Sequence, residues 1–306
     1  MVRIENRLRR SFFTLTESRI AHFRAVGQES TADNYRCALC CFREFRRQRD
    51  LSLAELTSDV MKLFQQHLQQ KGLSMNTISL YIRCLRASYN YALDEELLRE
   101  DRHPFRKVFT GVEKTRKRAV REEVVRQLMA LDLSDAPPLD VARDMFLFSI
   151  YAQGMAFVDM AHLTADNLSD GRLTYKRRKT GRSLSLELPP CALFILHKYR
   201  LSVQQSPYLL PLFHSAARQK YASVLRTYNR NLRLISERMN LATPLSSYVA
   251  RHTWASLAKW NGVEEAVISE AMGHNNIGTT TIYLASLDVE VIGAANRTVV
   301  DCLFAR

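Results

Sequence analysis

The chain lacks the features of a membrane or secreted protein. Its 306 residues contain no run of about 18 apolar side chains, the length that a helix needs to cross a bilayer. The first ten residues are basic but have no apolar core of the kind found in signal peptides. We therefore expect a cytoplasmic protein with no membrane partner.

Cysteine is scarce and does not form a metal-binding pattern. The six cysteines are Cys37, Cys40, Cys41, Cys84, Cys191 and Cys302. The Cys37-x-x-Cys40 pair has no second pair or nearby histidine that would complete a zinc site. The sequence indicates no metal, and we expect the thiols to be reduced and buried on a helix face.

Positive charge is abundant. The 44 Lys and Arg residues exceed the 31 Asp and Glu residues, which gives a formal net charge of +13. Seven basic residues and one acid lie in 104–121, six and none in 171–185, and eight and one in 198–238. Such charge favours a polyanion, with nucleic acid ahead of an anionic membrane surface. We interpret the three clusters as a phosphate-tracking surface, although solvated loops and helix faces are the alternative for any one of them.

The first part of the chain has the apolar spacing of helices. Apolar residues recur at helical spacing in 35–45, 53–70 and 78–92. Ser74-Met75-Asn76 opens the third helix, which His103-Pro104 stops. The sequence therefore predicts an all-helical domain over 1–103 and a basic linker over 104–118.

A second domain is expected over 119–306. A mostly apolar helical stretch over 145–163 is interrupted around Gly154. Between 172 and 188 apolar residues alternate around Lys179-Thr180-Gly181-Arg182, which predicts a β-hairpin. The rest reads as helices, so the expected fold class is mainly α with a small β-hairpin or sheet.

The candidate chemistry lies in the last 60 residues. Tyr248 and Arg251, three residues apart, share one helix face beside His252. His274 follows the end of a second helix, and Tyr283 comes nine residues later. A tyrosine can attack a phosphodiester and hold the strand as a phosphotyrosine, while cationic and hydrogen-bonding groups stabilise the phosphate charge. Each residue alone could be a packed aromatic or a surface contact, but the ordered set predicts DNA cleavage.

These motifs resemble the tyrosine recombinases, also called the phage integrase family. That family typically has a His-x-x-Arg-His, a Leu-Gly-His and a Thr-Thr-x-x-Tyr block, with a lysine on a β-hairpin. The matching segments here are Tyr248-x-x-Arg251-His252, Met272-Gly273-His274, Thr279-Thr280-Thr281-Ile282-Tyr283 and the hairpin residue Lys179. The resemblance covers almost the whole chain. It implies a SAM-like helical core-binding domain followed by a mostly helical catalytic domain.

The resemblance also implies a role for each residue. Tyr283 would attack the scissile phosphate, forming a 3′-phosphotyrosyl bond and freeing a 5′-hydroxyl. Arg251 would bind the non-bridging oxygens, and His274 would hydrogen-bond to the phosphate. Lys179 would protonate the departing 5′-oxygen, and His252 would support the site.

The sequence departs from the family at two points. The usual position of the first arginine is Ala156, and some relatives carry the arginine just before the glycine, where this chain has Gln153. Loss of one phosphate-binding arginine costs about 3 kcal/mol of transition-state stabilisation, by analogy with loss of an oxyanion donor. Tyr248 stands where histidine is usual, but its phenol can still donate a hydrogen bond to phosphate.

The expected partner is double-stranded DNA, bound by a homo-tetramer that assembles from free monomers on the bacterial nucleoid, without a cofactor. Basic residues of the hairpin and linker are predicted to contact it: Lys176, Arg177, Arg178, Arg182, Lys114, Arg116, Lys117 and Arg118. The apolar tail, 289–304, is expected to dock on a neighbouring protomer, and packing on its own core is the alternative.

Three functions are consistent with these residues. The leading hypothesis is a site-specific DNA recombinase of integrase or invertase type. The second is a DNA-binding protein of the same fold whose catalysis is impaired by the missing arginine. The third is a type IB topoisomerase, which shares the chemistry but fits the two-domain length less well.

Overall fold

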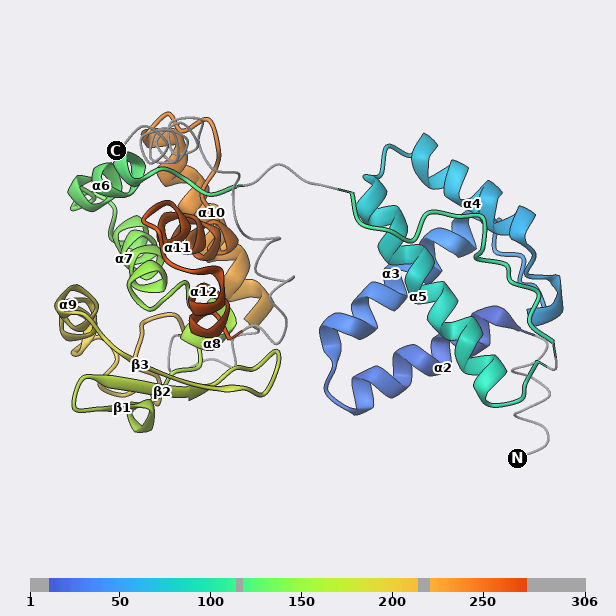
Figure 1. Cartoon of the computed structure of the whole chain (residues 1–306), viewed down its shortest axis with the longest axis horizontal. Helices are drawn as coiled ribbons and strands as arrows, with labels where there is room; N and C mark the ends of the chain where they lie inside the picture. Colours follow the sequence, from blue (N-terminus) through green and yellow to red (C-terminus); the bar gives the residue numbers. More distant parts are fainter. Residues whose placement is uncertain (1–10, 99, 114–117, 214–220, 274–306) are drawn as a thin grey trace, which may run out of the picture. The chain divides into compact units, whose positions relative to one another are not determined.

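The computed structural model of the chain describes residues 11–98, 100–113, 118–213 and 221–273. The chain divides into two compact units, 1–115 and 116–306 (Figure 1). The first contains α2 (Phe12–Ala25), α3 (Glu29–Phe45), η1 (Leu53–Glu55), α4 (Ser58–Gln70) and α5 (Met75–Asp94). The second contains α6 (Glu122–Ala130), α7 (Pro137–Tyr151), α8 (Phe157–Met160), η2 (Ala165–Asn167), β1 (Leu168–Ser169), β2 (Arg172–Lys176), β3 (Ser183–Glu187), α9 (Pro190–Tyr199), α10 (Tyr221–Arg238), α11 (Ser247–Trp260) and α12 (Glu265–Ala271). No helix in the described ranges is long and apolar enough to cross a membrane.

Helices α2 to α5 enclose an aromatic core. Phe42 of α3 is fully buried, and its ring lies 5.7 Å from Phe12 and 5.0 Å from Phe64 in edge-on geometry. The Ser74 hydroxyl accepts a hydrogen bond from the Thr77 N–H and so caps α5, which starts where the sequence predicted but ends at Asp94, before the predicted stop at His103-Pro104. The sequence analysis identified no α2, and the predicted helix over 53–70 is divided into η1 and α4.

The residues that follow α5 fold back onto the same unit. Phe105 is buried in its core. The Ser79 hydroxyl donates to the Gly111 carbonyl at 2.7 Å, and the Asn76 side chain bonds both backbone groups of Glu113 at 2.8 and 2.9 Å. The described part of the predicted linker, 104–113, therefore belongs to the first unit.

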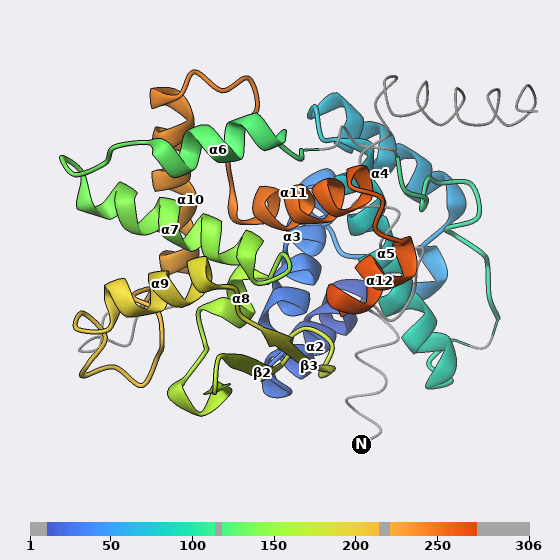
Figure 2. The ribbon, with the colours of Figure 1, turned by 60° about the vertical axis from the view of Figure 1, so that its left-hand side comes forward.

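The second unit has a three-stranded antiparallel sheet in the order β1-β2-β3. The predicted hairpin is present as β2 and β3, with Leu173 opposite Leu186 on the buried face. Helix α7 packs against α9, α10 and α11. The views of Figures 1 and 2 agree that the sheet lies at one end of this unit, with the closed end of the hairpin near α12. That juxtaposition builds the candidate site.

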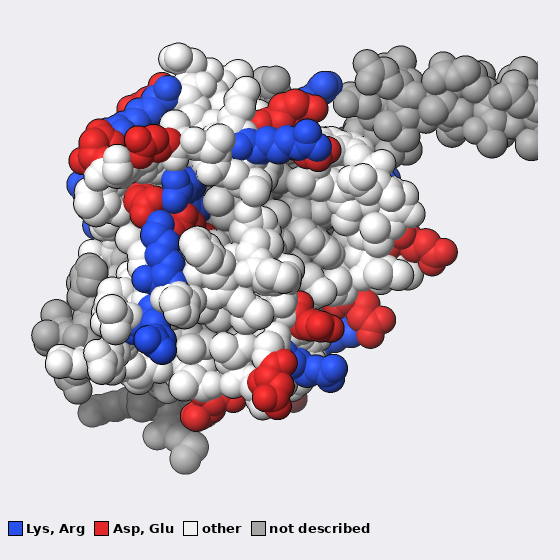
Figure 3. Space-filling view, turned by 90° about the vertical axis from the view of Figure 1, so that its left-hand side faces the viewer, with Lys and Arg blue, Asp and Glu red and all other residues white. Residues whose placement is uncertain are grey.

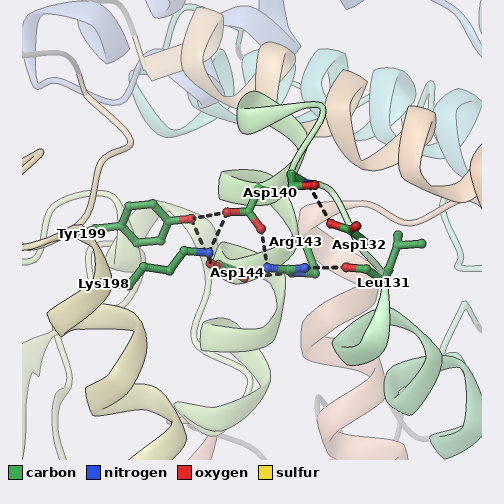
Figure 4. A network of polar contacts seen from close by, with 8 residues as sticks. Leu131, Asp132, Asp140, Arg143, Asp144, Lys198 and Tyr199 are labelled. Atoms are coloured by element: carbon green, nitrogen blue, oxygen red, sulfur yellow. Dashed lines mark hydrogen bonds and ion pairs between the residues drawn. The ribbon is translucent and has the colours of Figure 1, made fainter.

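An ionic network centred on the buried Asp144 fastens α9 to α7 (Figure 4). Lys198 Nζ lies 2.6 Å from carboxylate oxygens of both Asp140 and Asp144. The Tyr199 hydroxyl donates to Asp144 at 2.8 Å, and Arg143 pairs with both aspartates. Burial, together with the bond to Asp144, raises the pKa of the Tyr199 hydroxyl, so it stays protonated as a donor.

The cysteines differ from the sequence-based prediction. All five that the structure describes are free thiols, but only Cys84 is buried. Cys37 and Cys41 are half-buried, and Cys40 and Cys191 are exposed. The expectation of uniformly buried thiols was therefore wrong, because α3 turns only part of its cysteine-bearing face towards α5.

Candidate active site

Arg251 joins three segments of the second unit. It lies on α11 and is only 4% exposed, as its neighbours Val249 and Ala250 pack into the core. One guanidinium nitrogen, Nη1, donates to the Gly154 carbonyl at 2.6 Å, and Nη2 donates to the Met272 carbonyl at 2.6 Å. A guanidinium carries five N–H donors, so one arginine can hold backbone and also bind an oxyanion.

The turn between α7 and α8 is shaped by its approach to Arg251. Gln153 and Gly154 both have left-handed backbones, with φ of 59° and 68°. A Cβ on Gly154 would lie 3.3 Å from the Arg251 Cα, so glycine permits the close contact. Gln153 and Ala156, the two positions where the family pattern has its first arginine, flank this glycine and are half-buried. Neither supplies a cation here.

Arg177 does not lie where the sequence predicted. It was expected to contact DNA from the hairpin surface, but it is 6% exposed. Its Nη1 donates to the Gly273 carbonyl at 2.6 Å, and its Nε lies 3.7 Å from an oxygen of Asp159. The alternation of β2 continues one residue past its end at Lys176 and turns this side chain inward, because Leu173, Tyr175 and Arg177 fall on one face. The prediction for Arg177 is corrected accordingly.

The pKa of the Tyr175 hydroxyl reflects the charges around the buried arginines. Burial raises the pKa of its hydroxyl to about 12, and the charge of Asp159 adds to the rise. Arg251 and Arg177 oppose that shift, so both guanidinium groups act on the same buried hydroxyl. The region thus combines two cations and one carboxylate in a dehydrated setting.

The other hairpin residues are presented to solvent. Lys179 is exposed in the turn over 178–180, and Lys176 and Arg178 are exposed beside it. Arg182 is half-buried and lies 3.7 Å from the carboxylate of Glu270 on α12. The exposed hairpin positions leave Lys179 accessible to a bound strand.

Tyr248 and His252 form one aromatic pair on α11. Their ring centroids are 4.6 Å apart, with planes at 76°. Tyr248 is 49% exposed, whereas His252 is buried. Tyr248 and Arg251 therefore differ in exposure although they lie three residues apart on α11: Tyr248 faces solvent and Arg251 is buried.

Several predicted residues lie outside the described part of the chain. These are His274, Tyr283, Lys114, Arg116, Lys117 and the tail over 289–304. Arg118, the remaining linker residue, is exposed. The last described residue before His274 is Gly273, whose carbonyl Arg177 holds.

A stripe of arginines on α10 adds a basic surface. Arg226, Arg230 and Arg233 are exposed at helical spacing on one face. On the face drawn in Figure 3, by contrast, basic and acidic side chains are mixed among uncharged residues. The sequence analysis found this basic cluster but did not identify the stripe, which the spacing of four and three residues would have shown.

Solved structures place the fold in one class. The chain resembles the Tn1549 transposon integrase in complex with transposon right end DNA, with a TM-score of 0.71 and 14% identity over 94% of this chain and 99% of that one. It also resembles a lambda integrase dimer bound to a COC′ core site, with a TM-score of 0.69 and 15% identity over 94% of this chain and 83% of the other. At these identities the likeness shows the fold, which is that of the integrases.

The sequence then defines the family. Residues 11–125 match the phage integrase SAM-like domain, and residues 118–290 match the phage integrase family. The chain is 25% identical to the tyrosine recombinase XerD of Rhizobium meliloti, over 85% of this chain and 86% of that protein. It is 26% identical to the tyrosine recombinase XerA of Pyrococcus furiosus, over 72% and 73%.

The chain belongs to the phage integrase family, because the second match spans more than half of its length. It is a tyrosine recombinase, an enzyme that breaks and rejoins DNA strands at specific sites.

Proposed function

We propose that this recombinase cleaves DNA through Tyr283, with Arg251, His274, Lys179 and Tyr248 assisting. The main support for this proposal is the position of Arg251, which is buried and donates hydrogen bonds to the carbonyls of Gly154 and Met272. These bonds tie α11 to the turn before α8 and to the residues that lead into His274. A preorganised guanidinium at this point suits a phosphate whose charge grows in the transition state.

The chemistry proceeds in two balanced steps. The Tyr283 hydroxyl loses its proton to water and its oxygen attacks phosphorus, the bond to the 5′-oxygen breaks, and Lys179 gives that oxygen a proton. A 5′-hydroxyl of the partner strand then attacks the phosphotyrosine and returns its proton to Lys179, and the departing Tyr283 oxygen takes a proton from water. The bond energy is retained in the intermediate, so the exchange needs no nucleotide.

We propose double-stranded DNA as the partner and a tetramer as the active assembly, formed from monomers in the bacterial cytoplasm. The structural relatives support this, since lambda integrase forms a dimer on a core site and a tetramer on a Holliday junction. The exposed Lys176, Arg178 and Arg118, with the α10 stripe, supply phosphate contacts. Sedimentation of the purified chain with and without its DNA site tests the assembly, and a tetramer without DNA would contradict it.

Covalent trapping tests the cleavage. Genomic fragments that are chemically crosslinked to the chain in bacterial cells first identify its site, whether or not the chain cleaves them. A duplex of that sequence, nicked beside the cleavage position, then lets the short strand leave and accumulates the adduct. We expect an adduct with the native chain and none with Tyr283→Phe. A native chain that binds this duplex without forming an adduct would support the impaired-catalysis alternative.

A further inference from the structure

The buried part of the candidate site contains two guanidinium groups and a carboxylate. Arg177 and Arg251 are both buried, and the buried carboxylate of Asp159 lies beside Arg177. Buried charges are stable only when paired or hydrogen-bonded. The contacts that Arg177 makes therefore decide what else this guanidinium group can bind.

The two arginines hold consecutive residues of one loop. Arg251 bonds the carbonyl of Met272, and Arg177 bonds the carbonyl of Gly273, each at 2.6 Å. Consecutive Cα atoms are about 3.8 Å apart, so both guanidinium groups converge on the same short segment. Arg177 is therefore as close to the approach to His274 as Arg251 is.

The backbone at Gly273 is adapted to Arg177. A Cβ on this glycine would lie 2.8 Å from the Arg177 Cδ and 2.9 Å from a methyl carbon of Leu184. Gly273 also has a left-handed φ of 63°, which glycine adopts without strain. The space that the missing side chain leaves is filled by the arginine.

Asp159 does not use up the hydrogen-bonding capacity of Arg177. Their closest atoms, Nε and Oδ2, are 3.7 Å apart, and both are buried without a hydrogen bond. A charge-assisted arginine–carboxylate bond is about 2.7–2.9 Å long. Nothing among the described residues accepts a hydrogen bond from Nη2 of Arg177. Asp159 thus balances the charge of Arg177 but leaves the N–H groups on Nη2 able to donate to another acceptor.

We propose that Arg177 is the second phosphate-binding guanidinium of this recombinase, in place of the arginine missing at Ala156 and Gln153. The proposal rests on the proposed roles of Arg251 and Tyr283. Arg177 forms no covalent bond, since it keeps the Gly273 carbonyl with Nη1, keeps Nε beside Asp159, and donates from Nη2 to a non-bridging phosphate oxygen. The hairpin thereby supplies both a general acid and a phosphate ligand.

Single-turnover adduct formation on saturating nicked duplex tests this assignment. Arg177→Ala is expected to slow the reaction about 100- to 1,000-fold, the loss seen when one oxyanion donor is removed. Arg177→Lys, which keeps the charge but not the forked donors, serves if the alanine variant does not fold. Arg126→Ala removes an exposed, paired arginine of α6 and is the matched control, with an unchanged rate.

Two further measurements separate phosphate binding from a structural role. A methylphosphonate at the cleavage position lacks one anionic oxygen, so the penalty of Arg177→Ala should shrink at least about 10-fold on that substrate. Adding Ala156→Arg to the Arg177→Ala chain should restore at least about 10-fold of the rate. An equal penalty on both substrates, or a native rate for Arg177→Ala, overturns the inference. A native chain without any adduct contradicts the proposed function itself, and with it this inference.

Discussion

Two glycines of the second unit share a left-handed backbone but differ in surroundings. Gly154 has φ of 68° and would place a Cβ 3.3 Å from the Arg251 Cα. Gly262, at the end of α11, has φ of 79° and would place a Cβ in open space. The first glycine is therefore required by both the turn and the site, and the second by the turn alone.

Gly154→Ala should lower both stability and cleavage, whereas Gly262→Ala should lower stability alone. The left-handed conformation costs about 1–2 kcal/mol for a residue with a Cβ, in either variant. Only at Gly154 must the arginine backbone also move, so we expect at least about a 10-fold slower adduct formation there. Urea unfolding and single-turnover cleavage measure the two effects. Equal cleavage rates in both variants would refute the contact argument.

At the scale of secondary-structure elements, α7 is held by charges on one side and by apolar packing on the other. The carboxylate of Asp144 is 6% exposed and pairs with Arg143 and Lys198. Asp135, in the loop before α7, pairs with Arg238 of α10 but is 66% exposed. The two pairs link different elements to the same region in very different solvent environments.

Asp144→Ala should destabilise the second unit by about 1.5–3 kcal/mol, because it removes a buried carboxylate that Arg143, Lys198 and the Tyr199 hydroxyl contact, while Asp140 still pairs with both cations. Asp135→Ala should cost under about 1 kcal/mol, since solvent already screens that pair. Chemical denaturation of both variants measures the difference. A loss at Asp144 no larger than that at Asp135 would show that α9 is held by apolar contacts instead.

At the scale of the whole molecule, each of the two compact units is expected to fold on its own. The first unit includes the segment 104–113, which buries Phe105 and bonds Ser79 and Asn76. A boundary drawn at 103 would remove those contacts. A boundary at 115 would retain them.

A fragment covering 1–115 should be more stable than one covering 1–103 by about 3 kcal/mol. Burial of one phenylalanine contributes about 1.5–3 kcal/mol, and each hydrogen bond contributes about 0.5–1.5 kcal/mol. Thermal and urea unfolding of the two fragments test this difference. Identical stabilities would mean that 104–113 lies on the unit without stabilising it.

The α10 stripe predicts how DNA affinity depends on salt. Replacing Arg226, Arg230 and Arg233 by alanine should reduce the slope of log affinity against log salt by about 3, nearly one unit for each phosphate that is no longer neutralised. Arg126→Ala, on α6, should leave the slope unchanged. Binding titrations from low to moderate salt measure the slopes, and an unaltered slope in the triple variant would remove α10 from the interface.

The spacing of apolar residues in the sequence predicted which helices and strands exist more reliably than it predicted where they begin and end. Helical spacing identified α3, α4 and α5, and alternation identified β2 and β3, because these periods follow directly from backbone geometry. The spacing did not show that 104–113 belongs to the first unit, since its contacts reach back more than 30 residues. It also placed Arg177 with its basic neighbours, where charge pattern alone predicts a solvated side chain.

The sequence by itself determined the family and its chemistry, because Arg251, Lys179 and the motifs around Gly273 are side-chain types at fixed spacings. The tertiary structure decided which cations are buried. Arg177 and Arg178 are neighbours just after β2, but the Arg177 side chain is buried against Asp159 and the Gly273 carbonyl, from two other segments, whereas Arg178 is exposed. Whether a side chain is buried depends on residues that are distant in the chain, and the local spacing of residue types does not show where those residues lie.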